Sequence, residues 1–262
     1  MKPPYLSIVI PAFNEATRLP RTLARIREYV DARRLDAELL VIDDGSSDDT
    51  AGLASAQLAP LGPRGRVVRS PRNAGKGASV RRGMLAAVGT RVLFSDADLS
   101  TPIEEVEKLE RQLDQDVDVA IGSRALDRSL VEERQPWARD AGGRLFNLLV
   151  RHCAIDGIHD TQCGFKLFDA RVIHPIFART RIDGFGFDVE VLALARRLGA
   201  VIAEVPVRWR NDLDSRVTLW QGARAFADPL RVSAALALGT YRLPTGARAP
   251  RLAPVRVLAS GR

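Results

Sequence analysis

Short apolar runs alternate along the first 120 residues with segments whose apolar residues recur at helical spacing. The apolar runs predict buried strands over 6–10, 38–43, 66–70, 91–95 and 118–123. Helices are predicted over 49–59, 76–89 and 102–113. A further helix is predicted where Leu19, Leu23, Ile26 and Val30 form one helical face. This alternation predicts right-handed βαβ units and a parallel sheet.

The alternation becomes less regular after residue 123. Residues 124–143 are charged and have no clear period, whereas helices are predicted again over 143–153 and 187–199, and a strand over 201–209. The tail from Pro244 is rich in Pro, Gly and Arg, and we expect it to be poorly ordered. The predicted organisation is a domain at 1–216 with halves at 1–123 and 124–216, an amphipathic helical segment at 217–243 and a tail at 244–262.

Composition restricts the kinds of partner. The 262 residues include 39 Lys and Arg against 32 Asp and Glu, a net charge of +7 that suits an anionic partner. Only 6% of residues are aromatic and no long Lys/Arg block occurs, which argues against nucleic acid. Cys153 and Cys163 lack metal-binding spacing, so we expect buried free thiols in a reducing cytosol. No apolar run approaches the ~20 residues of a membrane span, so a soluble or peripheral protein is expected.

The stretch LFSDADLSTP places Asp96 and Asp98 directly after a predicted strand. Ligands of open parallel sheets bind at the carboxyl ends of the strands, and Asp44 and Arg124 also follow strands. Two carboxylates at this spacing can bind a hard divalent cation, which in turn bridges diphosphate oxygens. Alternatively, the aspartates cap a helix that begins near Pro102.

Two further segments carry candidate binding residues. In VIDDGSSDDT, Asp44 precedes an Asp-Gly turn, where its carboxylate can accept a hydrogen bond from a nucleobase imide or act simply as a turn residue. In NAGKGASVRRG, Lys76 lies between two glycines at a helix start. That arrangement suits oxyanion binding by backbone N–H groups, although a plain glycine-rich turn explains it equally well.

Taken together, these segments resemble the family 2 glycosyltransferases of the GT-A fold. The resemblance is greatest to the dolichyl-phosphate and polyprenyl-phosphate β-glucosyltransferases, with the dolichyl-phosphate mannose synthases as related enzymes. It covers about four-fifths of the chain, from residue 7 to about residue 217. The matching stretches are SIVIPAFNEATRLPRTL, VIDDGSSDDT, NAGKGASVRRGM, LFSDADLSTPIEEV, IGSR, DTQCGFKLF, GFGFDVEVLALARRLG and EVPVRW.

The resemblance implies a fold and a set of site residues. The fold would be α/β, a Rossmann-like GT-A domain with a mostly parallel sheet flanked by helices and a C-terminal helical extension. Residues 1–123 would bind a nucleotide-sugar and residues 124–216 the acceptor. Asp96 and Asp98 would hold Mg²⁺ or Mn²⁺, Arg124 and Arg139 would face the acceptor phosphate, and these four residues would be catalytic. The nucleotide-sugar site would comprise Pro11, Phe13, Glu15, Ile42, Asp44, Lys76, Asp96, Ala97 and Asp98.

By the same resemblance, the activity would be inverting transfer of a single hexose to a polyprenyl or dolichyl phosphate, with a β-linked product. UDP-glucose is the favoured donor and GDP-mannose the alternative. The processive QxxRW motif is missing, which argues for single transfer, and Arg216 stands where the family usually has Lys. The second interpretation is a family 2 transferase that acts on a saccharide or small-molecule hydroxyl. It would need a general base, for which Asp188 and Glu190 are candidates. Either residue could instead be a helix N-terminal charge, Asp188 in particular. A non-catalytic nucleotide-sugar-binding protein is the third interpretation.

The segment 217–242 mixes aromatic and aliphatic residues with arginines. Such a helix can lie in the headgroup layer of a membrane, which predicts a peripheral protein on the cytoplasmic membrane face. The same apolar residues could instead pack on the catalytic domain or form a homodimer interface. Pro229 is expected to break the helix.

Overall fold

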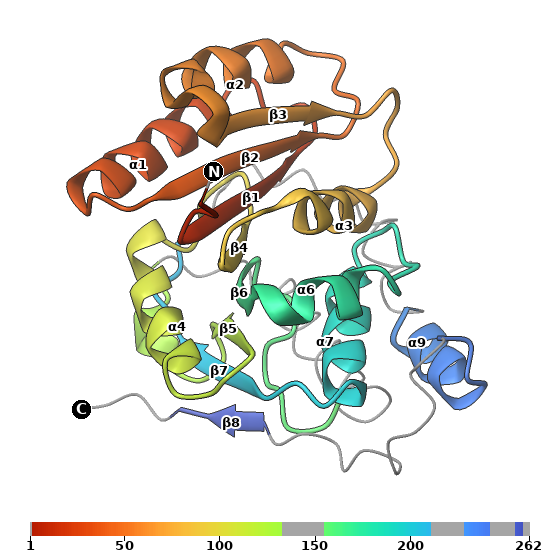
Figure 1. Cartoon of the computed structure of the whole chain (residues 1–262). Helices are drawn as coiled ribbons and strands as arrows, with labels where there is room; N and C mark the ends of the chain where they lie inside the picture. The colour runs from red at the N-terminus through yellow and green to blue at the C-terminus, as the bar shows by residue number, and fades with distance from the viewer. Residues whose placement is uncertain (1, 133–154, 211–227, 242–254, 259–262) are drawn as a thin grey trace.

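The computed structural model describes residues 2–132, 155–210, 228–241 and 255–258 (Figure 1). An eight-stranded sheet runs through this part of the chain in the order β3-β2-β1-β4-β6-β5-β7-β8. Strand β6 is antiparallel to β4 and β5, whereas the other neighbouring pairs are parallel. The predicted α/β fold with a mostly parallel sheet is therefore confirmed. The strands are β1 (Leu6–Ala12), β2 (Ala37–Asp43), β3 (Gly65–Arg69), β4 (Arg91–Ser95), β5 (Val119–Ser123), β6 (Phe165–Asp169), β7 (Ile202–Pro206) and β8 (Val255–Val257).

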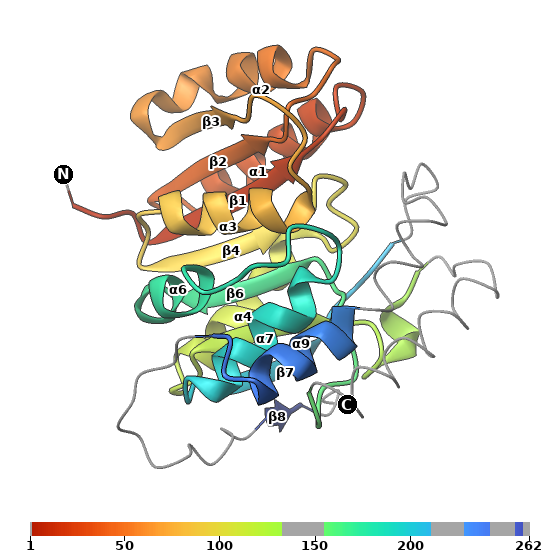
Figure 2. The same ribbon diagram turned by 90° about the vertical axis from the view of Figure 1, so that its right-hand side faces the viewer.

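Helices cover both faces of the sheet. Alternate residues of each central strand point to opposite faces, so that Val9 and Leu40 belong to one hydrophobic cluster and Ile8 and Leu39 to the other. The first cluster is covered by α3 (Lys76–Ala86), α6 (Ala170–Phe177), α7 (Phe187–Arg197) and α9 (Asp228–Ala237), which lie on one side of the sheet in Figure 2. The second is covered by α1 (Leu19–Ala32), α2 (Thr50–Leu58) and α4 (Val106–Leu113).

Two elements of the second half were not predicted. Strand β6 carries Lys166 as its second residue, and this charged residue interrupts the apolar run by which a buried strand is recognised. The Lys166 side chain is nevertheless only 1% exposed. Helix α6 directly follows β6, and the Asp169 side chain caps it by accepting a hydrogen bond from the Arg171 N–H.

The C-terminal region differs from expectation in part. Residues 255–258 are ordered, because β8 pairs with β7 and Val255 packs against the first hydrophobic cluster. The predicted helix at 143–153 lies outside the described residues. Among the residues that are described, no helix is long and apolar enough to cross a membrane.

Helix α9 supplies the described part of the predicted amphipathic segment. Its described part runs from Asp228 to Ala237, with Pro229 as the second residue. The residues before Asp228, where a break at Pro229 would show, lie outside the described residues. Val232 is buried against α7, as the packing alternative predicted. Leu230 on α9 and Leu238 directly after it are 54% and 81% exposed, so the end of this segment also presents apolar side chains to the surface.

The first turn of α3 joins the two halves of the domain. The N–H groups of Gly77 and Ala78 donate to the carbonyl of Asp183, at 2.7 and 3.3 Å. A Cβ atom on Gly77 would lie 2.3 Å from the carbonyl oxygen of Ile182, so only glycine permits this approach. The glycine-rich segment therefore packs on the chain just before α7.

Replacing Gly77 by alanine tests this packing. We expect Gly77→Ala to lower the free energy of unfolding by about 1–3 kcal/mol, because the added methyl group must displace backbone atoms. Gly184→Ala is the matched control, since no atom lies within 4 Å of its Cβ position. Urea denaturation followed by circular dichroism measures both. Equal stability of the two variants would contradict the close contact.

Candidate active site

Asp96 and Asp98 lie at a small pocket at the carboxyl end of β4. The Asp96 N–H donates to the carbonyl of Gly164 at 3.0 Å. A Cβ atom on Gly164 would lie 1.9 Å from Asp96 Oδ2, so glycine makes room for this carboxylate. The pocket is lined by Ser95, Asp96, Asp98, Leu99, Ser100, Thr101, Gly164 and Trp209.

The two carboxylates fit a hard divalent cation. Burial and the charge of Asp96 raise the pKa of Asp98, so a nearby cation would stabilise its ionised form. Within the described ranges, no cluster of three or more His, Cys, Asp or Glu residues suits a metal. A two-carboxylate site suits Mg²⁺ or Mn²⁺, which completes its coordination with water and phosphate oxygens. The helix-capping alternative is wrong, because neither residue caps the turn at 103–105 or α4.

Lys76 directs its ammonium group at this site. Its Nζ lies 2.7 Å from Asp96 Oδ1, and 5.7 and 5.8 Å from the ring centres of Phe94 and Phe185. Burial alone would lower the pKa of Lys76, but the charges of Asp96 and Asp188 outweigh it and raise the pKa. Lys76 is therefore cationic at neutral pH.

Asp44 fixes the segment before Lys76. Its side chain is buried at the sheet edge, and its two oxygens accept N–H groups from Ala74 and Gly75 at 3.0 and 2.8 Å. With Gly77 and Ala78 bonded to Asp183, four backbone N–H groups around Lys76 are already used. The prediction that this loop offers its N–H groups to an oxyanion is therefore wrong for these four groups.

The other residues predicted to line the nucleoside pocket divide into two groups. Phe13 is 40% exposed directly after β1. Pro11 and Ile42 are buried register partners in β1 and β2, and Ala97 is buried in the second cluster. These three residues are therefore part of the core at the carboxyl ends of β1, β2 and β4. The carboxylate of Glu15 is also buried and accepts a hydrogen bond from Arg18, which lies directly before α1.

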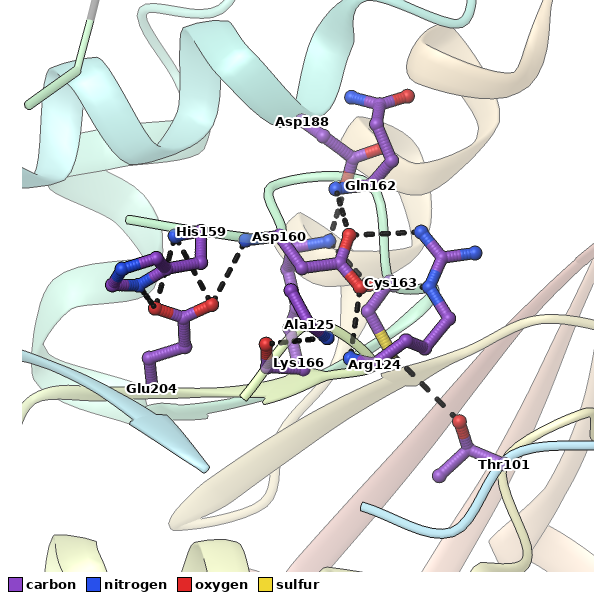
Figure 3. Close-up of polar contacts among 11 residues, drawn as sticks. Thr101, Arg124, Ala125, His159, Asp160, Gln162, Cys163, Lys166, Asp188 and Glu204 are labelled. Carbon is purple, nitrogen blue, oxygen red and sulfur yellow. Dashed lines mark hydrogen bonds and ion pairs between the residues drawn. The ribbon is translucent and has the colours of Figure 1, made fainter. Parts of the chain in front are cut away.

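Arg124 forms a bidentate ion pair with Asp160 (Figure 3). Its Nε and Nη2 atoms lie 2.7 and 2.8 Å from the two carboxylate oxygens, and its guanidinium carbon lies 5.5 Å from the ring centre of Trp209. Burial alone would raise the pKa of Asp160, but Arg124 outweighs it and lowers the pKa. The second predicted arginine, Arg139, lies outside the described residues.

Asp160 is held in turn by Glu204 of β7 (Figure 3). The fully buried Glu204 carboxylate accepts the N–H groups of His159 and Asp160, at 3.0 and 2.8 Å. The sequence analysis gave neither carboxylate a role. The only available signal was their occurrence in the matching stretches DTQCGFKLF and EVPVRW.

Asp188 forms a buried ion pair with Lys166. Lys166 Nζ lies 2.6 Å from Asp188 Oδ1 and 2.5 Å from the carbonyl of Cys163. Burial raises the pKa of Asp188, and the charges of Lys166 and Lys76 offset only part of this effect. Asp188 lies in the first turn of α7, as the helix-charge interpretation predicted. Its pairing with Lys166 argues against a role as general base.

Glu190 is also occupied structurally. Its fully buried carboxylate accepts the N–H groups of Arg181 and Ile182 and the hydroxyl of Tyr241, the last at 2.6 Å. It therefore fixes the chain before α7 and is not positioned as a base. Cys163 is a buried free thiol, as expected, and burial raises its pKa to about 11.

The chain is similar in sequence to known proteins. Residues 7–177 match the family model described as glycosyl transferase family 2. The dolichyl-phosphate β-glucosyltransferase of Mus musculus is 34% identical over 252 residues, which cover 91% of this chain and 78% of the mouse protein. The enzyme of the same name from Homo sapiens is 33% identical, with the same two coverages.

A solved structure has the same fold. Glucosyl-3-phosphoglycerate synthase from Mycobacterium tuberculosis, in complex with Mn²⁺ and UDP-glucose, superposes with a TM-score of 0.63. The alignment covers 88% of this chain and 79% of that one at 21% identity. At this identity the match establishes the GT-A fold alone.

Removing the Arg124 side chain should destabilise the protein in a pH-dependent way. Arg124→Met leaves the buried Asp160 carboxylate without its partner, at an expected cost of about 3–5 kcal/mol at pH 7. In the wild type the lowered pKa of Asp160 contributes stability above its unfolded value, and this is lost as pH falls through the folded pKa. In the variant, protonation of Asp160 removes the unpaired buried charge. The loss of unfolding free energy relative to wild type should therefore shrink as the pH is lowered toward 4.

Urea unfolding at several pH values measures this deficit. Arg171→Met is the control, because that arginine is 76% exposed and pairs with Asp169 at the surface. We expect little change in the control at any of these pH values. A deficit for Arg124→Met that is constant with pH would contradict the role assigned to Asp160.

Proposed function

Because the chain belongs to glycosyl transferase family 2, we propose that it transfers a single glucose from UDP-glucose to a polyprenyl or dolichyl phosphate. The enzyme is a glycosyltransferase, as its similarity to named glucosyltransferases indicates. The observation that carries the finer proposal is the convergence of Asp96, Asp98 and Lys76 at the end of β4. Lipid phosphate and glucose are proposed from the similarity to the dolichyl-phosphate β-glucosyltransferases.

The donor would bind across the carboxyl ends of β1, β2 and β4. Asp96 and Asp98 would hold Mg²⁺ or Mn²⁺, which supplies positive charge to the diphosphate as it leaves. The exposed ring of Phe13 would pack against the base, and Asp44 would contribute its remaining acceptor capacity to the base imide. Lys76 would add a second positive charge on the diphosphate side.

The acceptor would approach from the second half of the domain. A phosphate monoester is anionic near neutral pH, so it can attack the anomeric carbon without a general base. Arg124 and Arg139 would position it against repulsion from the donor diphosphate, through charge-assisted hydrogen bonds. Attack on the face opposite the leaving group converts an α-linked donor into a β-linked product.

Helix α9 would place the acceptor site beside a membrane. Leu230 on this helix and Leu238 directly after it are exposed, and the exposed Arg231 lies between them in sequence. An apolar surface with cations suits the headgroup layer of an anionic bilayer. We therefore propose peripheral association with the cytoplasmic membrane face.

A transfer assay tests the reaction. The purified protein is incubated with labelled UDP-glucose or GDP-mannose, Mn²⁺ or Mg²⁺ and a polyprenyl phosphate, and labelled lipid is then extracted into organic solvent. We expect glucose to be transferred and nuclear magnetic resonance to identify a β-linkage. Asp98→Asn should lower the rate by about 100-fold or more, because the leaving diphosphate loses its cation.

The matched control is Asp36→Asn, which removes a half-exposed carboxylate at the opposite end of the strands. It should transfer glucose at the wild-type rate. Transfer to a saccharide hydroxyl but not to lipid phosphate would contradict the proposed acceptor. Undiminished transfer by Asp98→Asn in the presence of a chelator would contradict the metal site.

Liposome flotation tests the membrane surface. We expect the wild type to float with vesicles that contain anionic lipid, and less so as the salt concentration rises. The double variant Leu230→Ser, Leu238→Ser should float several-fold less, whereas Leu53→Ser, which changes an exposed leucine on α2, should not differ from wild type. Equal flotation of the double variant would show that α9 is not the docking surface.

A further inference from the structure

Lys76 and the proposed metal ion depend on the same carboxylate. Lys76 Nζ lies 2.7 Å from Asp96 Oδ1, and Asp96 is one of the two residues assigned to the metal. A divalent cation bound to Asp96 would therefore lie within a few ångströms of a positive charge. At such a separation the repulsion is large enough to change metal affinity.

The Lys76 ammonium group is held in place. Asp44 and the Asp183 carbonyl fix the backbone on either side of it through four hydrogen bonds. The rings of Phe94 and Phe185 lie under the ammonium at 5.7 and 5.8 Å, and the side chain is 25% exposed. Because both backbone and side chain are constrained, Lys76 stays beside Asp96.

The neighbouring carboxylate does not neutralise Lys76. Asp188 acts electrostatically on Lys76, but its oxygen lies 2.6 Å from the buried Lys166 ammonium. Asp188 is thus already paired with a lysine of its own. The positive charge of Lys76 is therefore balanced mainly by the carboxylate of Asp96.

We infer that Lys76 is a resident counter-cation that competes with the divalent metal for Asp96 and attracts the diphosphate of the donor. The free enzyme then binds metal weakly, and the metal enters together with the nucleotide-sugar rather than before it. This inference rests on the proposed function, since it assumes that Asp96 binds a metal and that the donor carries a diphosphate.

The test measures the two ligands separately in Lys76→Met, which removes the charge and keeps an unbranched side chain. Mn²⁺ binding without nucleotide is followed by electron paramagnetic resonance of free Mn²⁺, and we expect it to be about tenfold tighter than in wild type. UDP binding in the presence of a chelator is followed by calorimetry, and we expect it to be about tenfold weaker. General damage to the site would weaken both, so the opposite directions identify the charge effect.

Three controls accompany this variant. Lys76→Arg keeps the positive charge, and both affinities should remain within about threefold of wild type. Arg82→Met removes a charge from the same helix, where Arg82 bonds Ser70 rather than Asp96, and should change neither affinity. If Lys76→Met does not fold by circular dichroism, Lys76→Gln supplies the same two measurements.

The outcomes separate the inference from the proposed function. If wild type binds Mn²⁺ and UDP but the neutral variant binds Mn²⁺ no more tightly, the inference is wrong and the metal site stands. If wild type binds no Mn²⁺ with or without UDP, the metal assignment is wrong and the inference falls with it. Tighter Mn²⁺ and weaker UDP binding in the neutral variant, with both retained in Lys76→Arg, would establish it.

Discussion

The buried ion pair between Lys166 and Asp188 is the interaction on which the arrangement of the site depends. A buried ammonium group on a central strand would destabilise the fold by several kcal/mol if it were left unpaired. Strand β6 can therefore occupy its position between β4 and β5 only with the first turn of α7 above it. That requirement also places the chain before α7 against α3 and leaves Asp96 as the carboxylate nearest Lys76.

The two halves of the sheet are consequently joined close to Lys76. The Asp183 carbonyl holds the first turn of α3, and Glu190 holds the backbone of Arg181 and Ile182 just before it. Tyr241, which lies shortly after the end of α9, donates its hydroxyl to the same Glu190. The geometry of Lys76 is therefore set by residues of the second half as much as by its own loop.

The sequence predicted the features that depend on local pattern. Strands buried on both faces produce uninterrupted apolar runs, and Asp96 and Asp98 stand out because they directly follow one. It could not reveal pairings made across long stretches of chain. Strand β6 was not predicted because Lys166 looks like a surface residue, and its partner Asp188 lies 22 residues further along the chain. Likewise, Asp160 and Arg124 form an ion pair although 36 positions separate them in sequence. Gly77 and its neighbours were misread because a glycine pattern indicates close approach without identifying what approaches.

The place of β6 in the sheet also sets the order in which the chain can fold as it is synthesised. Strands β1 to β4 find all their mutual partners within the first 95 residues. Strand β5, in contrast, lies between β6 and β7, which are synthesised after it. Until residue 169 has emerged, β4 exposes an unpaired edge and β5 has no neighbour. Strands β1 to β4 can thus form a template at an early stage, and β5 to β7 must assemble onto it.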